Sequence, residues 1–118
     1  MSISIELRFS KADKYGNHVF ICSKKNPDEA KAMEQLNIIH DKMEDLETTG
    51  FLPIYKADTY TTVRIRKTDA KFVANAVYMI VFSIHKFVKE TTTFACMLSK
   101  SKLIKKAPEV DMGELMEF

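Results

Sequence analysis

Apolar residues near the N-terminus follow the pattern of a hairpin. Residues 3–9 place an apolar side chain at every second position, which predicts a strand with one buried face. Gly16 and Asn17 then supply turn residues, and the segment 18–22 is again rich in β-branched and aromatic residues. We therefore predict two antiparallel strands joined by a turn.

A helix is predicted to follow this hairpin. Asn26 can cap it, Pro27 suits its first position, and Glu29 occupies the capping-box position. Apolar residues then recur every three or four positions, which predicts one buried stripe made of Met33, Leu36, Ile39, Met43 and Leu46. The segment Thr48–Gly50 is expected to end the helix, since glycine favours the left-handed conformation found there.

The residue pattern in the second half of the chain predicts strands. Residues 51–55 are expected to form an extended connector, and residues 60–67 alternate strictly. One face of that strand is predicted to be core, and the other is basic and aromatic. The core face carries Thr61, Val63 and Ile65, and the outer face carries Tyr60, Thr62, Arg64 and Arg66.

Two further strands are predicted after the loop 68–75. Residues 76–84 are apolar at nearly every position, which favours a strand covered on both faces, with a buried helix as the alternative. Residues 91–98 form another strand, which four lysines prolong through residue 106. The prediction is a mainly β fold with one helix (α+β), in which residues 1–106 form the domain and 107–118 a flexible acidic tail.

Charge is strongly segregated along the chain, although the formal net charge is only +2. Acids outnumber bases between Pro27 and Glu47, and residues 107–118 contain four acids and no base. The remainder is therefore strongly basic. A positive field of this size on a small domain attracts polyanions, of which nucleic acid is the most common.

Several classes of protein are excluded or disfavoured. The longest apolar run, residues 76–84, is far shorter than a membrane helix requires, and the N-terminus does not resemble a secretory signal. Cys22 and Cys96 are isolated, so reduced thiols and an intracellular, cytoplasmic location are expected.

Catalytic and phosphate-binding motifs do not occur in the chain. None of GxxxxGK[ST], GxGxxG, HExxH or GxSxG is present, and the three histidines share no metal-ligand spacing with the cysteines. We expect no enzyme, no cofactor and no metal site.

Basic and aromatic residues are interleaved on the later strands, as in proteins that bind single-stranded nucleic acid. In such proteins cations follow the phosphates and flat rings stack on unpaired bases. Tyr60 and Phe87 are the best stacking candidates, followed by Tyr15. The candidate nucleic-acid-binding residues are Tyr60, Arg64, Arg66, Lys67, Lys86, Phe87, Lys89, Lys100 and Lys102.

The order of elements resembles the compact OB-fold single-stranded DNA-binding proteins of phages. The resemblance is carried by residues 18–46, 60–67, 76–104 and 109–118. It implies a five-stranded OB-fold-like barrel with the helix inserted after the second strand. It also implies a protein that coats unpaired DNA during replication or recombination without reading its sequence.

By the same resemblance, the acidic tail occupies the DNA groove when DNA is absent and contacts replication proteins. The tail residues concerned are Glu109, Asp111, Glu114, Glu117 and Phe118. RNA is an alternative ligand, and pairing of sheet edges would give a homodimer. A different function is a protein-binding module or an inhibitor of a host nucleic-acid enzyme, acting through the acidic helix or tail.

Overall fold

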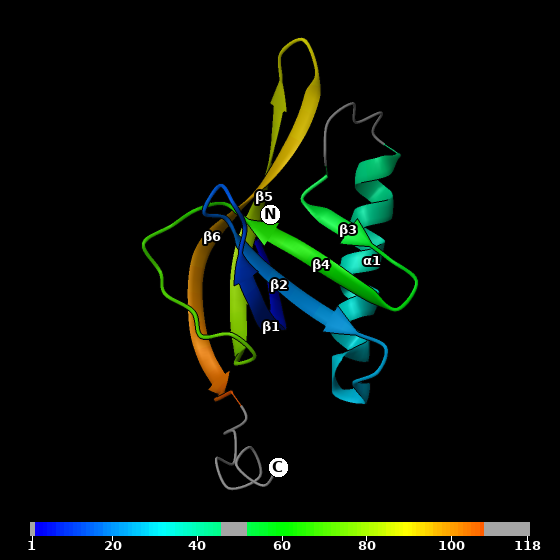
Figure 1. Cartoon of the computed structure of the whole chain (residues 1–118). Helices are drawn as coiled ribbons and strands as arrows, with labels where there is room; N and C mark the ends of the chain where they lie inside the picture. The colour runs from blue at the N-terminus through cyan, green and yellow to red at the C-terminus, as the bar shows by residue number, and fades with distance from the viewer. Residues whose placement is uncertain (1, 46–51, 108–118) are drawn as a thin grey trace, which may run out of the picture.

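Five strands form a closed barrel in the computed structural model, which describes residues 2–45 and 52–107 (Figure 1). Around the barrel the order is β1, β2, β4, β6, β5 and back to β1, and only β4 and β6 pair in parallel. The bounds are β1 Ser2–Ala12, β2 His18–Ser23, β4 Tyr60–Ile65, β5 Val77–Val88 and β6 Thr92–Lys105. The predicted OB-fold-like α+β class is thereby confirmed.

Alternating apolar residues fill the barrel, as the period-two patterns predict. β1 contributes Ile5, Leu7 and Phe9 to the core, and β4 buries Thr61 and Ile65 on its inner face. The outer residues of β4 are half-buried. The predicted division of β4 into a core face and a basic, aromatic face is therefore confirmed.

Two segments differ from the sequence prediction. The connector predicted over residues 51–55 contains a short strand, β3 (Ile54–Lys56), which pairs with residues Thr61–Val63 of β4. β5 is a strand rather than the alternative helix, but it is not covered on both faces. Its inward residues Tyr78, Ile80 and Phe82 are buried, whereas the residues between them are half-buried. Thus β5 has one face in the core, like the other strands.

The helix follows β2, as predicted, and packs against β2, β3 and β4. It consists of a 3-10 turn, η1 (Pro27–Glu29), followed by α1 (Ala30–Glu44), and α1 buries Met33, Leu36 and Met43. Within the described residues, neither helix has the length and apolarity needed to cross a bilayer. The predicted helix end at Thr48–Gly50 lies outside the described residues.

The hydrogen bonds at the start of the helix centre on Glu29 and differ from the cap predicted for Asn26. The Asn26 side chain makes no capping hydrogen bond to a backbone N–H of the first turn. Instead the Glu29 carboxylate accepts hydrogen bonds from the Asn26 side-chain amide at 2.8 Å and from the Ser23 backbone N–H at 3.2 Å. It also forms an ion pair with Arg8 of β1 at 3.2 Å. One carboxylate therefore connects β1, β2 and the helix start.

The connection between β4 and β5 closes one part of the core with an aromatic side chain. Phe72 lies at the centre of a group of mostly edge-to-face rings, a geometry that stabilises aromatic pairs by about 0.5–1.5 kcal/mol beyond burial. Its ring centroid is 4.9–5.4 Å from those of Phe9, His18, Phe20 and Tyr78. The loop that follows Arg66 is thus anchored to the barrel.

Both cysteines are expected to resist alkylation in the folded protein. Cys22 and Cys96 are free and buried. Burial raises the pKa of Cys96 to about 12, and burial together with the Glu29 charge raises that of Cys22 to about 11. Because the thiolate is the reactive species, iodoacetamide at pH 8 should label native protein about a hundredfold more slowly than denatured protein. Mass spectrometry of labelling time courses checks this, and similar rates would contradict it.

Candidate nucleic-acid interface

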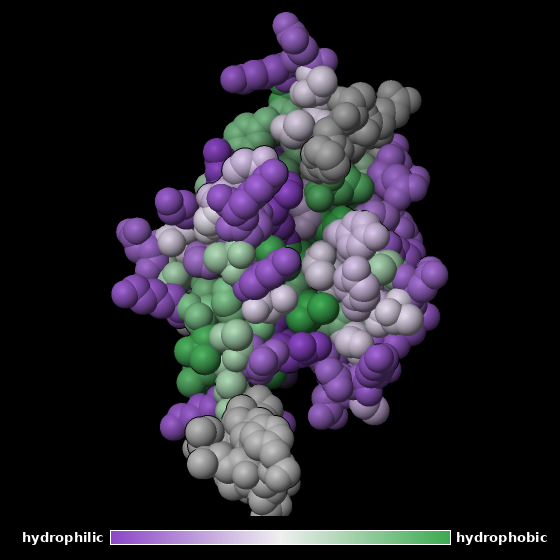
Figure 2. Space-filling model, viewed as in Figure 1, coloured by the Kyte–Doolittle hydropathy of each residue, from purple (hydrophilic) through white to green (hydrophobic). Residues whose placement is uncertain are grey.

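A groove runs along the outer side of β4 and β6 and continues onto the β5–β6 hairpin. It consists of two adjoining hollows of about 330 Å³ and about 450 Å³, which share Arg66, Phe94 and Ala95. We call the two together the β4–β6 groove. Its lining comprises Tyr15, Asn17, Pro53, Arg64, Arg66, Phe87, Lys89, Thr91, Thr93, Phe94, Ala95 and Cys96. On the side where β4 faces the viewer, hydrophilic side chains alternate with apolar surface (Figure 2).

β4 sets the position of the two arginines in this groove. Arg64 stands between buried Val63 and Ile65 on the outward face, and Arg66 follows two residues later. The backbone N–H of Arg64 donates to the Pro53 carbonyl at 2.7 Å, and that of Arg66 donates to the Cys96 carbonyl at 2.9 Å. Among the described residues, neither guanidinium has a carboxylate within 4 Å. Their charges are therefore available to a ligand.

The β1–β2 turn forms one end of the groove. The Asp13 carboxylate accepts hydrogen bonds from the backbone N–H groups of Tyr15 and Asn17, both at 2.9 Å. Desolvation raises the pKa of Asp13. Hydrogen bonds from Asn17 and Tyr15, together with the charge of Arg64, lower this pKa by more, so the net shift is downward. The side chain of Asn17 accepts a hydrogen bond from the Lys67 N–H at 3.1 Å. These contacts hold the exposed Tyr15 ring beside the groove.

The β5–β6 hairpin forms the other end. β1 pairs with β5 only as far as Ser83, so the hairpin beyond it projects from the barrel (Figure 1). Phe87 lies opposite Thr93 near its tip and is 43% exposed. Phe87 and Lys89 line the same hollow as Arg66. The Phe87 ring of β5 therefore meets two cations at this end, Arg66 just after β4 and Lys89 in the β5–β6 turn.

The other predicted residues lie elsewhere. Tyr60 is at the far end of β4, where its ring centroid is 6.1 Å from that of Tyr55. The Lys67 side chain lies over Gly16 in the β1–β2 turn. Lys86, Lys100 and Lys102 do not line the β4–β6 groove. Lys100 and Lys102 instead pair with Val81 and Met79 of β5, which in turn pair with β1.

Seven lining residues were not among the candidates from the sequence, namely Asn17, Pro53, Thr91, Thr93, Phe94, Ala95 and Cys96. Asn17 looked like a turn residue, and Thr93 and Phe94 belong to a strand predicted without assigning its faces. Pro53 lay in the predicted connector. The alternation of the threonine-rich strand could have placed Thr93 and Ala95 on one face, but it could not have shown that this face adjoins Arg66.

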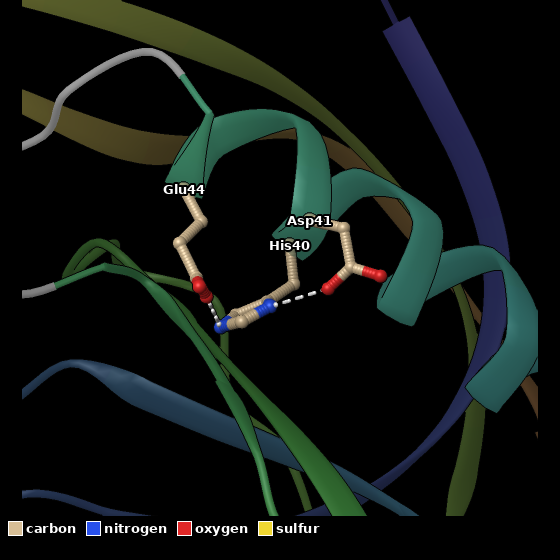
Figure 3. Close-up of side chains that lie close together, drawn as sticks. All are labelled: His40, Asp41 and Glu44. Atoms are coloured by element: carbon tan, nitrogen blue, oxygen red, sulfur yellow. Dashed lines mark hydrogen bonds and ion pairs between the residues drawn. The ribbon is translucent and has the colours of Figure 1, made fainter.

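The acidic side of α1 contains a small cluster of charged residues (Figure 3). The Nδ1 of His40 lies 3.1 Å from Asp41 and its Nε2 lies 3.6 Å from Glu44. A hydrogen bond from His40 lowers the pKa of Asp41, whereas desolvation raises it. A hydrogen bond from Lys56 and the charge of Lys56 also lower this pKa, so the net shift is downward. Ligand atoms of the three residues lie within 4.8 Å of one another, but the two ring nitrogens face different carboxylates. We therefore interpret the cluster as an ion-pair network that joins α1 to β3.

The predicted tail residues 109–118 lie outside the described residues. Comparison of the chain with protein-family models, with curated protein sequences and with solved structures gave no match.

Proposed function

We propose that the protein binds single-stranded nucleic acid, with DNA as the primary ligand, in the β4–β6 groove. The observation that carries this proposal is the position of Arg64 and Arg66. Among the described residues neither guanidinium has a carboxylate within 4 Å, and the two arginines share one groove with Phe87 and Lys89. Cations in a groove bind phosphates, and an exposed ring beside them offers a stacking surface for an unpaired base.

The composition of the groove favours binding without sequence preference. The described lining is dominated by cations and rings, and Asn17 supplies its one side-chain amide. Rings and cations recognise features that every nucleotide shares. We therefore propose a role in coating unpaired strands during replication or recombination, as the resemblance to phage proteins implies.

Titration of labelled oligo-dT, followed by fluorescence anisotropy at two salt concentrations, tests the proposal. Binding should be detectable at low salt and should weaken steeply as salt rises, because counterions are released from each neutralised phosphate. Absence of binding below about 100 μM at low salt would exclude the proposal, since non-specific affinities normally lie in that range or tighter. A matched RNA oligomer decides between the two nucleic acids.

Phe87→Ala is expected to weaken oligo-dT binding by about 5-fold to 150-fold, which corresponds to the 1–3 kcal/mol of one stacked base. Its ring is exposed on the hairpin, so the free energy of unfolding should change little. Val88→Ala is the matched control, since this residue is also exposed and alternates to the other side of the strand. Equal losses for the two variants would show that Phe87 does not stack.

Deletion of residues 108–118 is expected to tighten oligo-dT binding at low salt. The deletion removes four negative charges and no positive ones, so the field that attracts phosphates becomes stronger. The gain should shrink as salt is raised, because salt screens the interaction. Anisotropy titrations of the full and shortened chains check this. Equal affinities at low salt would show that the tail charges do not weaken the field that attracts phosphates.

A further inference from the structure

The last part of β6 has an open edge. β6 pairs with β5 along one side, whereas on the other side its only pairing with β4 is between Cys96 and Ile65. Among residues 2–45 and 52–107, no other backbone group bonds to the far edge of residues 97–105. Alternate N–H and C=O groups of an antiparallel strand point to that edge. Such an edge is a template for an added strand.

The side chains on this stretch define what the edge can accept. All residues from Ser99 to Lys105 are exposed, and Lys100, Lys102 and Lys105 lie among them. Leu103 is 46% exposed and gives the stretch an apolar contact. Pairing with the β6 edge of a second copy would oppose lysine to lysine, and like charges across a strand pair are destabilising. The edge therefore favours an acidic strand with apolar residues between its acids.

Residues 109–118 have this composition. They contain four acids and no base, and residues 109–112 read Glu, Val, Asp, Met. In an extended conformation Glu109 and Asp111 share one face, and Val110 and Met112 share the other. With residues 109–114 antiparallel to residues 100–105, Glu109 would lie opposite Lys105 and Glu114 opposite Lys100. Val110 would lie opposite Ile104, which is 45% exposed, so the two ends of the pair match in charge and one position matches in apolarity.

The connection is short enough for the segment to reach the edge within one molecule. β6 ends at Lys105, and three residues separate it from Glu109, a common length for a hairpin loop. Pro108 lies in that loop, where its missing N–H breaks no strand pairing. A tether of this length gives an effective concentration of the order of millimolar, which exceeds that of any separate peptide at ordinary protein concentration.

We propose that residues 109–114 of the same molecule add to the open edge of β6 as an antiparallel strand beside residues 100–105. This surface differs from the β4–β6 groove, and the proposal does not depend on nucleic-acid binding. Its consequence is that the tail covers the sheet edge that would otherwise be free to pair with another chain.

Amide hydrogen exchange tests this by comparing the full chain with a chain that ends at Ala107. Several amides among residues 100–105 should exchange at least tenfold more slowly in the full chain. The ratio of exchange rates, shortened chain to full chain, should fall to about one in the Lys100→Glu, Lys105→Glu variant. Adding Glu109→Lys and Glu114→Lys to that variant should restore the ratio, because these residues would lie opposite the two lysines. Lys24→Glu with Lys25→Glu is the control for a general charge effect, and it should leave the ratio unchanged.

Three results would overturn the proposal. The first is identical exchange of residues 100–105 in the full and shortened chains. The second is protection that moves to Tyr15, Arg66 and Phe87, which would place the tail in the β4–β6 groove. The third is protection that increases with protein concentration, because this would show that the added strand comes from a second molecule.

Discussion

Reversing both groove arginines, by Arg64→Glu with Arg66→Glu, is expected to weaken oligo-dT binding by at least about a hundredfold at low salt. Each phosphate contact on a single strand contributes about 0.7 to the slope of log affinity against log salt. The loss of two contacts therefore accounts for one to two orders of magnitude at about 50 mM salt, and repulsion by the new carboxylates adds to it. The slope itself should fall by about 1.4.

Lys24→Glu with Lys25→Glu is the matched control for this experiment. It changes the net charge by the same amount, but these lysines follow β2 and lie outside the β4–β6 groove. Only the long-range field should change, so the loss of affinity should be several times smaller. Equal losses in the two variants would show that nucleic acid is not bound preferentially in the groove.

Phe20→Ala is expected to lower the free energy of unfolding by about 3–5 kcal/mol. Phe20 is fully buried, and its ring centroid lies 5.3 Å from that of Phe9 and 5.0 Å from that of Phe72. Removal of the ring leaves a cavity and ends these edge-to-face contacts. A small domain is stable by only about 5–15 kcal/mol, so this is a large fraction of the total.

Urea denaturation followed by circular dichroism measures this effect. Phe87→Ala removes the same side chain from an exposed position and should change the free energy of unfolding by less than about 1 kcal/mol. If Phe20→Ala does not fold, Phe20→Leu can be measured instead, because leucine retains more of the side-chain volume. Its free energy of unfolding should lie between those of the wild type and Phe20→Ala. A loss below about 1 kcal/mol for Phe20→Ala would contradict the assigned packing.

Patterns within a single strand could be predicted from the sequence, whereas relations between strands could not. Alternation placed Arg64 and Arg66 on the outer face of β4 because side-chain direction has a period of two in any strand. The pairing of β6 with its neighbours depends on barrel closure and register, including two irregularities opposite β5. This is why Lys100 and Lys102, expected at the binding face, lie outside the groove.

Short and irregular segments were the least predictable. β3 has three residues and follows Pro53, so no periodic pattern could reveal it. β5 looked buried on both sides because its sequence is apolar at both faces. Its half-buried outer residues, such as Met79 and Val81, lie beside β1 and β6 on the barrel exterior. Composition alone does not show which apolar face is covered.

The pairing of β1 with β5 constrains how the chain folds during synthesis. Ser2 pairs with Ser83, about eighty residues later, so β1 lacks one neighbour until most of the chain has left the ribosome. Until then the nascent hairpin of β1 and β2 exposes an apolar edge that is prone to wrong pairing. Strand contacts between such distant residues also slow folding to the millisecond-to-second range typical of β-barrels. Chaperone capture of nascent chains should accordingly be greatest before residue 88 emerges.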